Sequence, residues 1–152
     1  MRFESAEAAN ANSDKPEQSE WWAEFETTLD GEASFQNNSN VIVGAVGDLD
    51  AAGFVQVMDG QSSDPVRSLD LMYRSRDARV ANRPDILGSI VVGHDDGKFT
   101  MVVYFESEEA ARQGESKEVP PQLQVTMKEM QSLSVGRPEF LDLKTPWLNS
   151  PK

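Results

Sequence analysis

The sequence contains no cysteine and only one histidine, His94. Without cysteine, the chain has no disulfide bond, no thiolate metal ligand and no cysteine nucleophile. This composition is compatible with a reducing compartment, and we expect a cytoplasmic protein. We also predict that the chain needs neither a metal ion nor a cofactor.

Long hydrophobic runs and basic residues are also scarce. The longest apolar run, "VIVGAV" at 41–46, is far shorter than a membrane span, and no apolar stretch follows Arg2 as in a secretory signal. The chain has 14 basic and 26 acidic residues, a formal charge of −12, with nine acidic and two basic residues in 1–32. Because this charge repels phosphate backbones, we predict no nucleic-acid binding. Because the apolar runs are short, we predict no membrane insertion.

The 152 residues, of which 38% are hydrophobic, suit one folded domain with additions at its ends. Residues 1–20 are polar and acidic, and we predict a disordered tail because they offer little apolar surface to bury. Residues 21–52 form a predicted N-terminal extension with a short helix and a strand. The domain itself is predicted over 53–143, with a C-terminal tail at 144–152.

The extension begins with "WWAEFETTL", an aromatic segment. Trp21, Trp22, Phe25 and Leu29 have the spacing of one helical stripe. Such a stripe packs against its own domain or a sister subunit, or it binds a protein partner, and the sequence leaves these alternatives open.

The order of elements within 53–143 defines a fold class. Strands are predicted at 54–58, 85–93, 98–106 and 135–143, and a hairpin turn at 94–97 joins the second to the third. A helix begins with Asp64 as its N-cap and Pro65 in its first turn and ends near Asn82, and another begins after Ser107 and ends at Gly114. A further helix begins around Pro120. The order β-α-β-β-α-β predicts a ferredoxin-like α+β fold, an antiparallel sheet with helices on one face.

Two of these strands carry apolar residues on both faces. In "KFTMVVYFE", Phe99, Met101, Val103 and Phe105 alternate with Thr100, Val102 and Tyr104. Helices cover only one face of such a sheet, so a second copy of the sheet is expected to cover the other face. The sequence therefore predicts a homodimer.

Residues 53–143 resemble the dimeric α+β barrel superfamily, in particular its antibiotic biosynthesis monooxygenase-like domains. The resemblance rests on "GFVQVMDG", "RPDILGSIVVGHDDGKFTMVVYFESEEAARQGE" and "SVGRPEFLDL". It implies a dimeric barrel that holds a small aromatic molecule between sheet and helices, and for some members cofactor-independent oxygenation. Where the family pattern has a Glu-Arg-Trp-like group and then a histidine, this chain has Val103, Tyr104, Phe105 and a helix without histidine. The sequence therefore leaves open whether the protein is an enzyme.

Few residues are candidates for a catalytic or metal-binding role. His94 has an ordinary pKa near 6.5 and so suits general-base catalysis, but it lies in the predicted hairpin turn beside Asp95 and Asp96. Consecutive turn residues point in different directions, which argues against a metal site there. Tyr73 and Tyr104 are the other weak catalytic candidates, each with a hydroxyl on an apolar element.

The predicted ligand-binding residues belong to the first helix and the third strand of the domain. They are Tyr73, Arg76, Tyr104 and Phe105. Arg76, Arg79 and Arg83 recur at helical spacing, which is typical of a solvated face and is also compatible with an anion site.

Two functions follow as hypotheses. The first is a homodimer that binds a hydrophobic or aromatic small molecule, with cofactor-independent oxygenation as its candidate activity. The alternative is a non-catalytic dimerisation module whose Trp21, Trp22 and Phe25 bind a protein partner.

Overall fold

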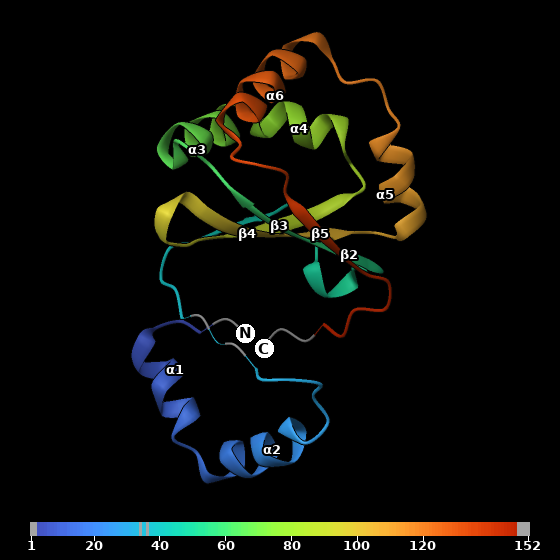
Figure 1. Ribbon diagram of the computed structural model, residues 1–152. Coiled ribbons are helices and arrows are strands. Elements are labelled where there is room, and N and C mark those ends of the chain that lie inside the picture. The colour runs from blue at the N-terminus through green and yellow to red at the C-terminus, as the bar shows by residue number, and fades with distance from the viewer. Residues whose placement is uncertain (1–2, 34, 36, 149–152) are drawn as a thin grey trace. The chain divides into compact units, whose positions relative to one another are not determined.

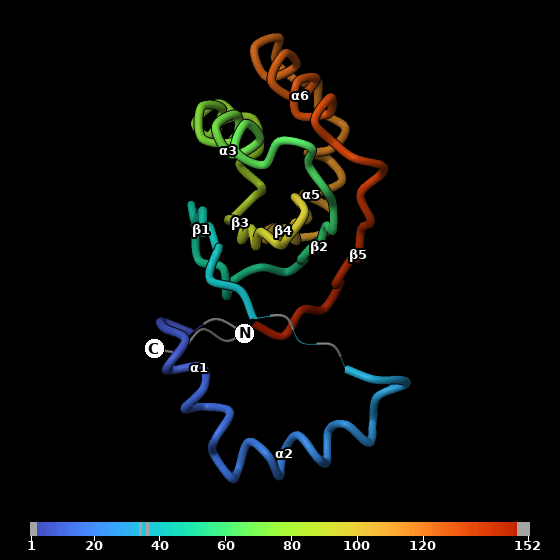
Figure 2. Tube along the Cα trace, turned by 60° about the vertical axis from the view of Figure 1, so that its left-hand side comes forward, coloured from blue at the N-terminus to red at the C-terminus, as the bar shows by residue number. Residues whose placement is uncertain are grey.

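The computed structural model of the chain describes residues 3–33, 35 and 37–148. The chain forms two compact units, Met1–Ser39 and Asn40–Lys152. The second unit contains a five-stranded sheet with helices, and it is shown in Figures 1 and 2.

The sheet is antiparallel throughout, with the strand order β1-β3-β4-β2-β5. Its strands are β1 (Val41–Ala45), β2 (Phe54–Gln61), β3 (Ile86–Gly93), β4 (Lys98–Phe105) and β5 (Glu139–Leu143). The predicted β-α-β-β-α-β order and ferredoxin-like sheet are therefore confirmed. The strand predicted at 41–46 is present as β1, and it pairs with β3 at one edge.

Within residues 40–148 the second unit has four α-helices, and Figure 1 shows them on one face of the sheet. They are α3 (Pro65–Arg74), α4 (Arg76–Asn82), α5 (Glu108–Glu115) and α6 (Pro121–Leu133). Short 3-10 turns occur at Leu49–Ala51 and Asp95–Gly97. Asp64 caps α3 by accepting a hydrogen bond from the Arg67 amide, and Ser107 caps α5 through the Ala110 amide, as the sequence predicts.

The most buried side chains lie between α5 and the strands β2 and β4. Phe54 and Phe105 pack at 5.6 Å between ring centroids, against Ala111 of α5. Ile86 and Val103 extend this cluster. Burial of these large apolar groups fixes α5 on the sheet.

The opposite face of the sheet carries a row of apolar residues, one from each strand. The register places the following five side by side across the sheet: Val43, Ile90, Val102, Val57 and Leu141. None of the five is fully buried, and Leu141 is 60% exposed. Both faces of the sheet are thus apolar, as the strand pattern predicts.

The first unit contains two helices, α1 (Ala6–Ser13) and α2 (Pro16–Glu26). Part of the segment predicted as a disordered tail is therefore helical here, because Ser5 caps α1 and Pro16 is accommodated in the first turn of α2. Neither helix contains a buried residue. The domain boundaries predicted at 20, 52 and 143 remain predictions.

The aromatic segment of the first unit is helical only as far as Glu26. The hydroxyls of Thr27 and Thr28 donate to the Glu24 and Phe25 carbonyls at 2.7 Å, which ends α2 before Leu29. The prediction that Leu29 shares the helical stripe is therefore wrong. Trp21 stacks on Phe25 at 4.9 Å between ring centroids and is 53% exposed.

Candidate ligand-binding cavity

A cavity of about 250 Å³ lies between the sheet and the pair α3 and α4. Most of its surface is apolar. The sheet contributes residues of β1 and β3, and the two helices contribute the opposite wall. The main lining side chains are Ile42, Leu69, Met72, Tyr73, Arg76, Arg79, Val80, Arg83, Ser89 and Val91. We call it the α3–α4 cavity.

A break at Ser75 shapes the helical wall of this cavity. The sequence predicts one helix from Asp64 to Asn82, but the structure divides it into α3 and α4. Ser75 has φ −92° and ψ 1°, and its buried hydroxyl donates to the Leu71 carbonyl at 2.7 Å. This back-bonding gives the chain an alternative to continued helical pairing, which explains the break.

Arg79 spans the junction between the two helices. Its Nη2 donates at 3.0 Å to the carbonyl of Met72, one of the last carbonyls of α3. Its Nε is buried and has no hydrogen-bond partner among the described residues. Burial lowers the pKa of Arg79 from its ordinary value, because water is removed from the charged group. An arginine nevertheless keeps its charge in a protein.

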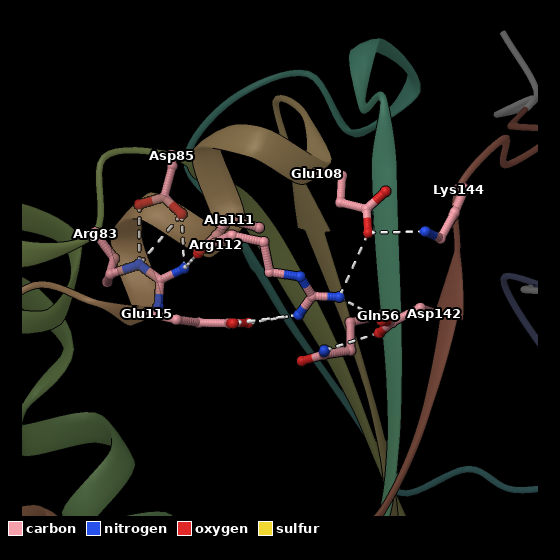
Figure 3. Close-up of polar contacts among 9 residues, drawn as sticks. All are labelled: Gln56, Arg83, Asp85, Glu108, Ala111, Arg112, Glu115, Asp142 and Lys144. Carbon is pink, nitrogen blue, oxygen red and sulfur yellow. Dashed lines mark hydrogen bonds and ion pairs between the residues drawn. The ribbon is translucent and has the colours of Figure 1, made fainter.

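Arg83, also at the cavity, is neutralised by Asp85 (Figure 3). Its Nε and Nη2 donate to the two carboxylate oxygens at 2.9 and 2.7 Å, and Nη2 also reaches the Ala111 carbonyl at 3.3 Å. Asp85 is only 7% exposed. Burial raises the pKa of Asp85, but the hydrogen bonds and charge of Arg83 outweigh it, and the pKa is lowered overall.

A second polar cluster in Figure 3 surrounds Arg112 and lies outside the cavity lining. Arg112 donates to Glu115 at 3.1 Å and pairs with Asp142 of β5, which also accepts from Gln56 at 2.9 Å. The hydrogen bond from Gln56 is the main cause that lowers the pKa of Asp142. Because every one of these charges has a partner, the cluster joins α5 and β2 to β5 rather than forming an open site.

The structure brings two of the predicted site residues together and separates the others. Tyr73, 63% exposed, and Arg76 both line the α3–α4 cavity. Phe105 is buried in the core beside α5, and Tyr104 is not part of the cavity lining.

His94 lies in the predicted hairpin turn. Its amide donates to the Lys98 carbonyl at 2.8 Å, and its Nε2 is 3.0 Å from the Thr100 hydroxyl. The Thr100 hydroxyl in turn donates to Asp59 at 2.5 Å. His94 is therefore held by a hydroxyl at the end of the sheet and does not line the cavity.

The chemistry of the lining favours binding of an organic molecule. It contains three arginines, one tyrosine and one serine but no carboxylate and no histidine. Within 3–33, 35 and 37–148, no group of three or more potential metal-ligating side chains occurs. Over the same residues, no helix is long and apolar enough to span a membrane.

Sequence reasoning missed the contribution of β1 to this cavity. Ile42, Val43 and Gly44 were expected in an extension outside the domain, whereas β1 pairs with β3 and forms one wall. No sequence signal identifies the partner of an isolated edge strand. The spacing of Arg76, Arg79 and Arg83 is typical of a solvated face and compatible with an anion site, and all three residues line the cavity.

No protein-family model and no curated protein sequence matches the chain. Solved structures do match. A proposed monooxygenase from Lactobacillus acidophilus superposes with a TM-score of 0.67 over 92% of this chain, at 9% identity. This chain spans 65% of the length of that protein.

Two Streptomyces proteins match a smaller share of the chain. SnoaB of Streptomyces nogalater, a cofactor-independent oxygenase, matches 66% of this chain and all of its own, with TM-score 0.50 and 15% identity. The ActVA-Orf6 monooxygenase of Streptomyces coelicolor, solved with nanaomycin D, matches 67% of this chain and 95% of its own, with TM-score 0.50 and 19% identity. The chain therefore has the fold of the antibiotic biosynthesis monooxygenases, and the resemblance expected from the sequence is confirmed for the fold.

Proposed function

We propose that the chain binds a small aromatic molecule in the α3–α4 cavity. The observation that carries this proposal is the cavity itself, whose lining is mostly apolar and has a few polar groups. Binding sites for small molecules have this composition. At about 250 Å³ the cavity is smaller than the roughly 300–1,000 Å³ typical of drug-sized ligands, so one or two fused rings suit it best.

The proposal extends to oxygenation of the bound molecule without a cofactor. The same fold occurs in SnoaB and ActVA-Orf6, which supports this extension. An electron-rich phenol or naphthol reacts with oxygen most readily as its anion, and the cavity arginines favour an anion by charge. Because the lining holds no carboxylate or histidine, the proton leaves to solvent or to a group of the substrate itself.

The proposed active form is a homodimer. The apolar row through Ile90, Val102 and Val57 lies on the sheet face that α3 to α6 leave uncovered (Figure 1). Association of two such faces removes apolar surface from water, and each Å² buried stabilises the dimer by about 25 cal/mol. Light scattering on the intact chain is expected to give about twice 16.8 kDa, and Val57→Asp is expected to give a folded monomer. A wild-type monomer would contradict this part of the proposal.

Gly44 offers a direct test of the cavity. A Cβ on Gly44 would lie 3.7 Å from the Ser89 hydroxyl oxygen, an ordinary contact, so a side chain fits the strand and projects into the lined space. Gly44→Val is expected to abolish binding, and Gly44→Ala, which fills less space, is the matched control and is expected to weaken it only partly.

The assay is a panel of phenols, quinols and naphthalene derivatives, with thermal denaturation to detect binding and oxygen uptake to detect turnover. Ligands are expected to raise the melting temperature of the wild type and not that of Gly44→Val. If no aromatic compound stabilises the wild type, ligand binding is rejected. If ligands bind but no oxygen is consumed, only the oxygenase extension fails.

A second candidate function rests on the exposed aromatic side chains of the first unit. Trp21, Phe25 and Phe35 are all exposed, and such aromatic groups are favoured at protein interfaces. Deletion of residues 1–32 would remove a bound partner if this interaction exists. An unchanged set of co-purifying proteins would argue against it.

A further inference from the structure

The arginines near the α3–α4 cavity differ in whether they have an acidic partner. Arg67 pairs with Asp70 at 2.8 Å and with Glu129, Arg74 with Asp70 at 2.8 Å, and Arg83 with Asp85. Among the described residues, Arg76 and Arg79 form no ion pair. These two arginines both line the cavity.

Lack of an ion pair does not by itself distinguish these two arginines, because Lys15, Lys98, Lys117, Lys128 and Arg137 also form none among the described residues. Arg79 is distinguished by its burial beside the cavity, where the only acceptor that its side chain reaches among the described residues is the Met72 carbonyl. A charge removed from water without a counter-ion destabilises the empty state of the protein, and a bound anion would reverse that cost.

We propose that the ligand of the cavity is an aromatic acid, an anion whose carboxylate or equivalent oxyanion pairs with Arg79 and Arg76 while its rings lie on the apolar wall. This inference rests on the proposed function and specifies the class of molecule bound. A planar guanidinium matches the two oxygens of a carboxylate, and Ser89 lines the opposite wall. Ile42, Leu69 and Val91 provide the apolar surface for the rings.

Other anions fit less well. A nucleotide or polyphosphate needs several donors and more room than a mostly apolar cavity of about 250 Å³ provides. A neutral aromatic molecule would fill the space but would leave the Arg79 charge without a counter-ion. The lining thus selects a molecule that has both an apolar body and one anionic end.

The test compares two probes of the same shape, 2-naphthoate and neutral 2-naphthamide, by isothermal titration calorimetry on the full chain. Hydrogen bonds to a charged group correspond to about a tenfold to hundredfold difference in affinity. The wild type is expected to bind naphthoate at least about tenfold more tightly than naphthamide. Arg79→Gln is expected to remove this preference by weakening naphthoate alone.

Two further variants separate charge from packing. Arg79→Lys keeps the positive charge and is expected to restore part of the preference for naphthoate. Arg74→Gln removes the same charge from an arginine that is paired with Asp70 and does not line the cavity, so it is expected to leave the preference unchanged. If Arg79→Gln does not fold, Arg76→Gln at the exposed position serves instead, with a smaller loss of the same sign.

The outcomes separate this inference from the proposed function. If both probes bind the wild type equally, or if Arg79→Gln and Arg76→Gln keep the preference, the anionic ligand is rejected and the cavity proposal survives. If neither probe nor any other aromatic compound binds, the proposed function itself fails. Loss of the preference in Arg79→Gln and its retention in Arg74→Gln would support the inference.

Discussion

Substitution of Gly114 by alanine is expected to destabilise the protein, against the usual effect of this change in a helix. Gly114 lies inside α5, where alanine is normally favoured over glycine by about 1 kcal/mol. Here an added Cβ would overlap Nε of Arg83 and would lie 2.7 Å from its Cζ and 2.8 Å from its Nη2.

The size of the loss in stability depends on how far the added Cβ would weaken the hydrogen bonds between Arg83 and Asp85. Non-bonded heavy atoms approach to about 3.5 Å, so the guanidinium has to move by roughly 1 Å. Its bidentate bonds hold the buried carboxylate of Asp85, and each such charged bond contributes about 1.5–3 kcal/mol. Weakening them outweighs the gain in helix propensity and leaves a net loss of about 1–2 kcal/mol.

Urea and thermal denaturation followed by circular dichroism would measure this loss, which corresponds to a fall in Tm of roughly 3–10 °C for a unit of this size. Gln113→Ala, at an exposed position of the same helix, is the control and is expected to change stability little. In an Arg83→Ala background the clash is absent, so Gly114→Ala is expected to be neutral or stabilising. If Gly114→Ala stabilises the otherwise unchanged chain, the argument from close contact is refuted.

Two other changes test the polar contacts. The folded pKa of Asp85 lies below its ordinary value, so its contribution to stability is complete above about pH 5 and is lost as pH falls through the folded pKa. The free energy of unfolding of the wild type relative to Asp85→Asn is therefore expected to shrink as the pH falls below about 5, and a constant difference would contradict the pairing with Arg83. Ser107→Ala removes the oxygen that accepts from the Ala110 amide at 3.1 Å and is expected to cost about 1 kcal/mol, measured by urea denaturation, whereas Ser107→Asp should retain most of the stability.

The parts of the fold that sequence reasoning recovered are those set by local patterns. Asp64 and Ser107 act as helix caps, and the alternation through β3 and β4 gives paired strands, because caps and pleats depend on neighbouring residues. Gly114 shows where local reasoning fails. It was predicted to end its helix, but α5 continues to Glu115, and the glycine is instead needed for the close approach of Arg83 from a distant segment.

The candidate site was only partly predictable for the same reason. Tyr73 and Arg76 were identified from their helix, yet the helix break at Ser75 and the pairing of β1 with β3 decide which residues share a cavity with them. Tyr104 and Phe105 have equally suggestive sequence contexts, but alternate residues of a strand face opposite sides of the sheet. Neither of them reaches the cavity lining.

The roles of Arg79 in α4 and of Arg83, the residue that follows the end of α4, depend on each other. Arg83, fixed by Asp85 and by the Ala111 carbonyl, ties the end of α4 to the core beside α5. Arg79, four residues earlier and therefore about one turn away on the same helix face, is then held over the cavity without needing a carboxylate of its own. A carboxylate beside Arg79 would fix the side chain equally well, but it would also neutralise the charge that an anionic ligand requires. Pairing at Arg83 and its absence at Arg79 thus give one helix both a stable position and a positively charged cavity wall.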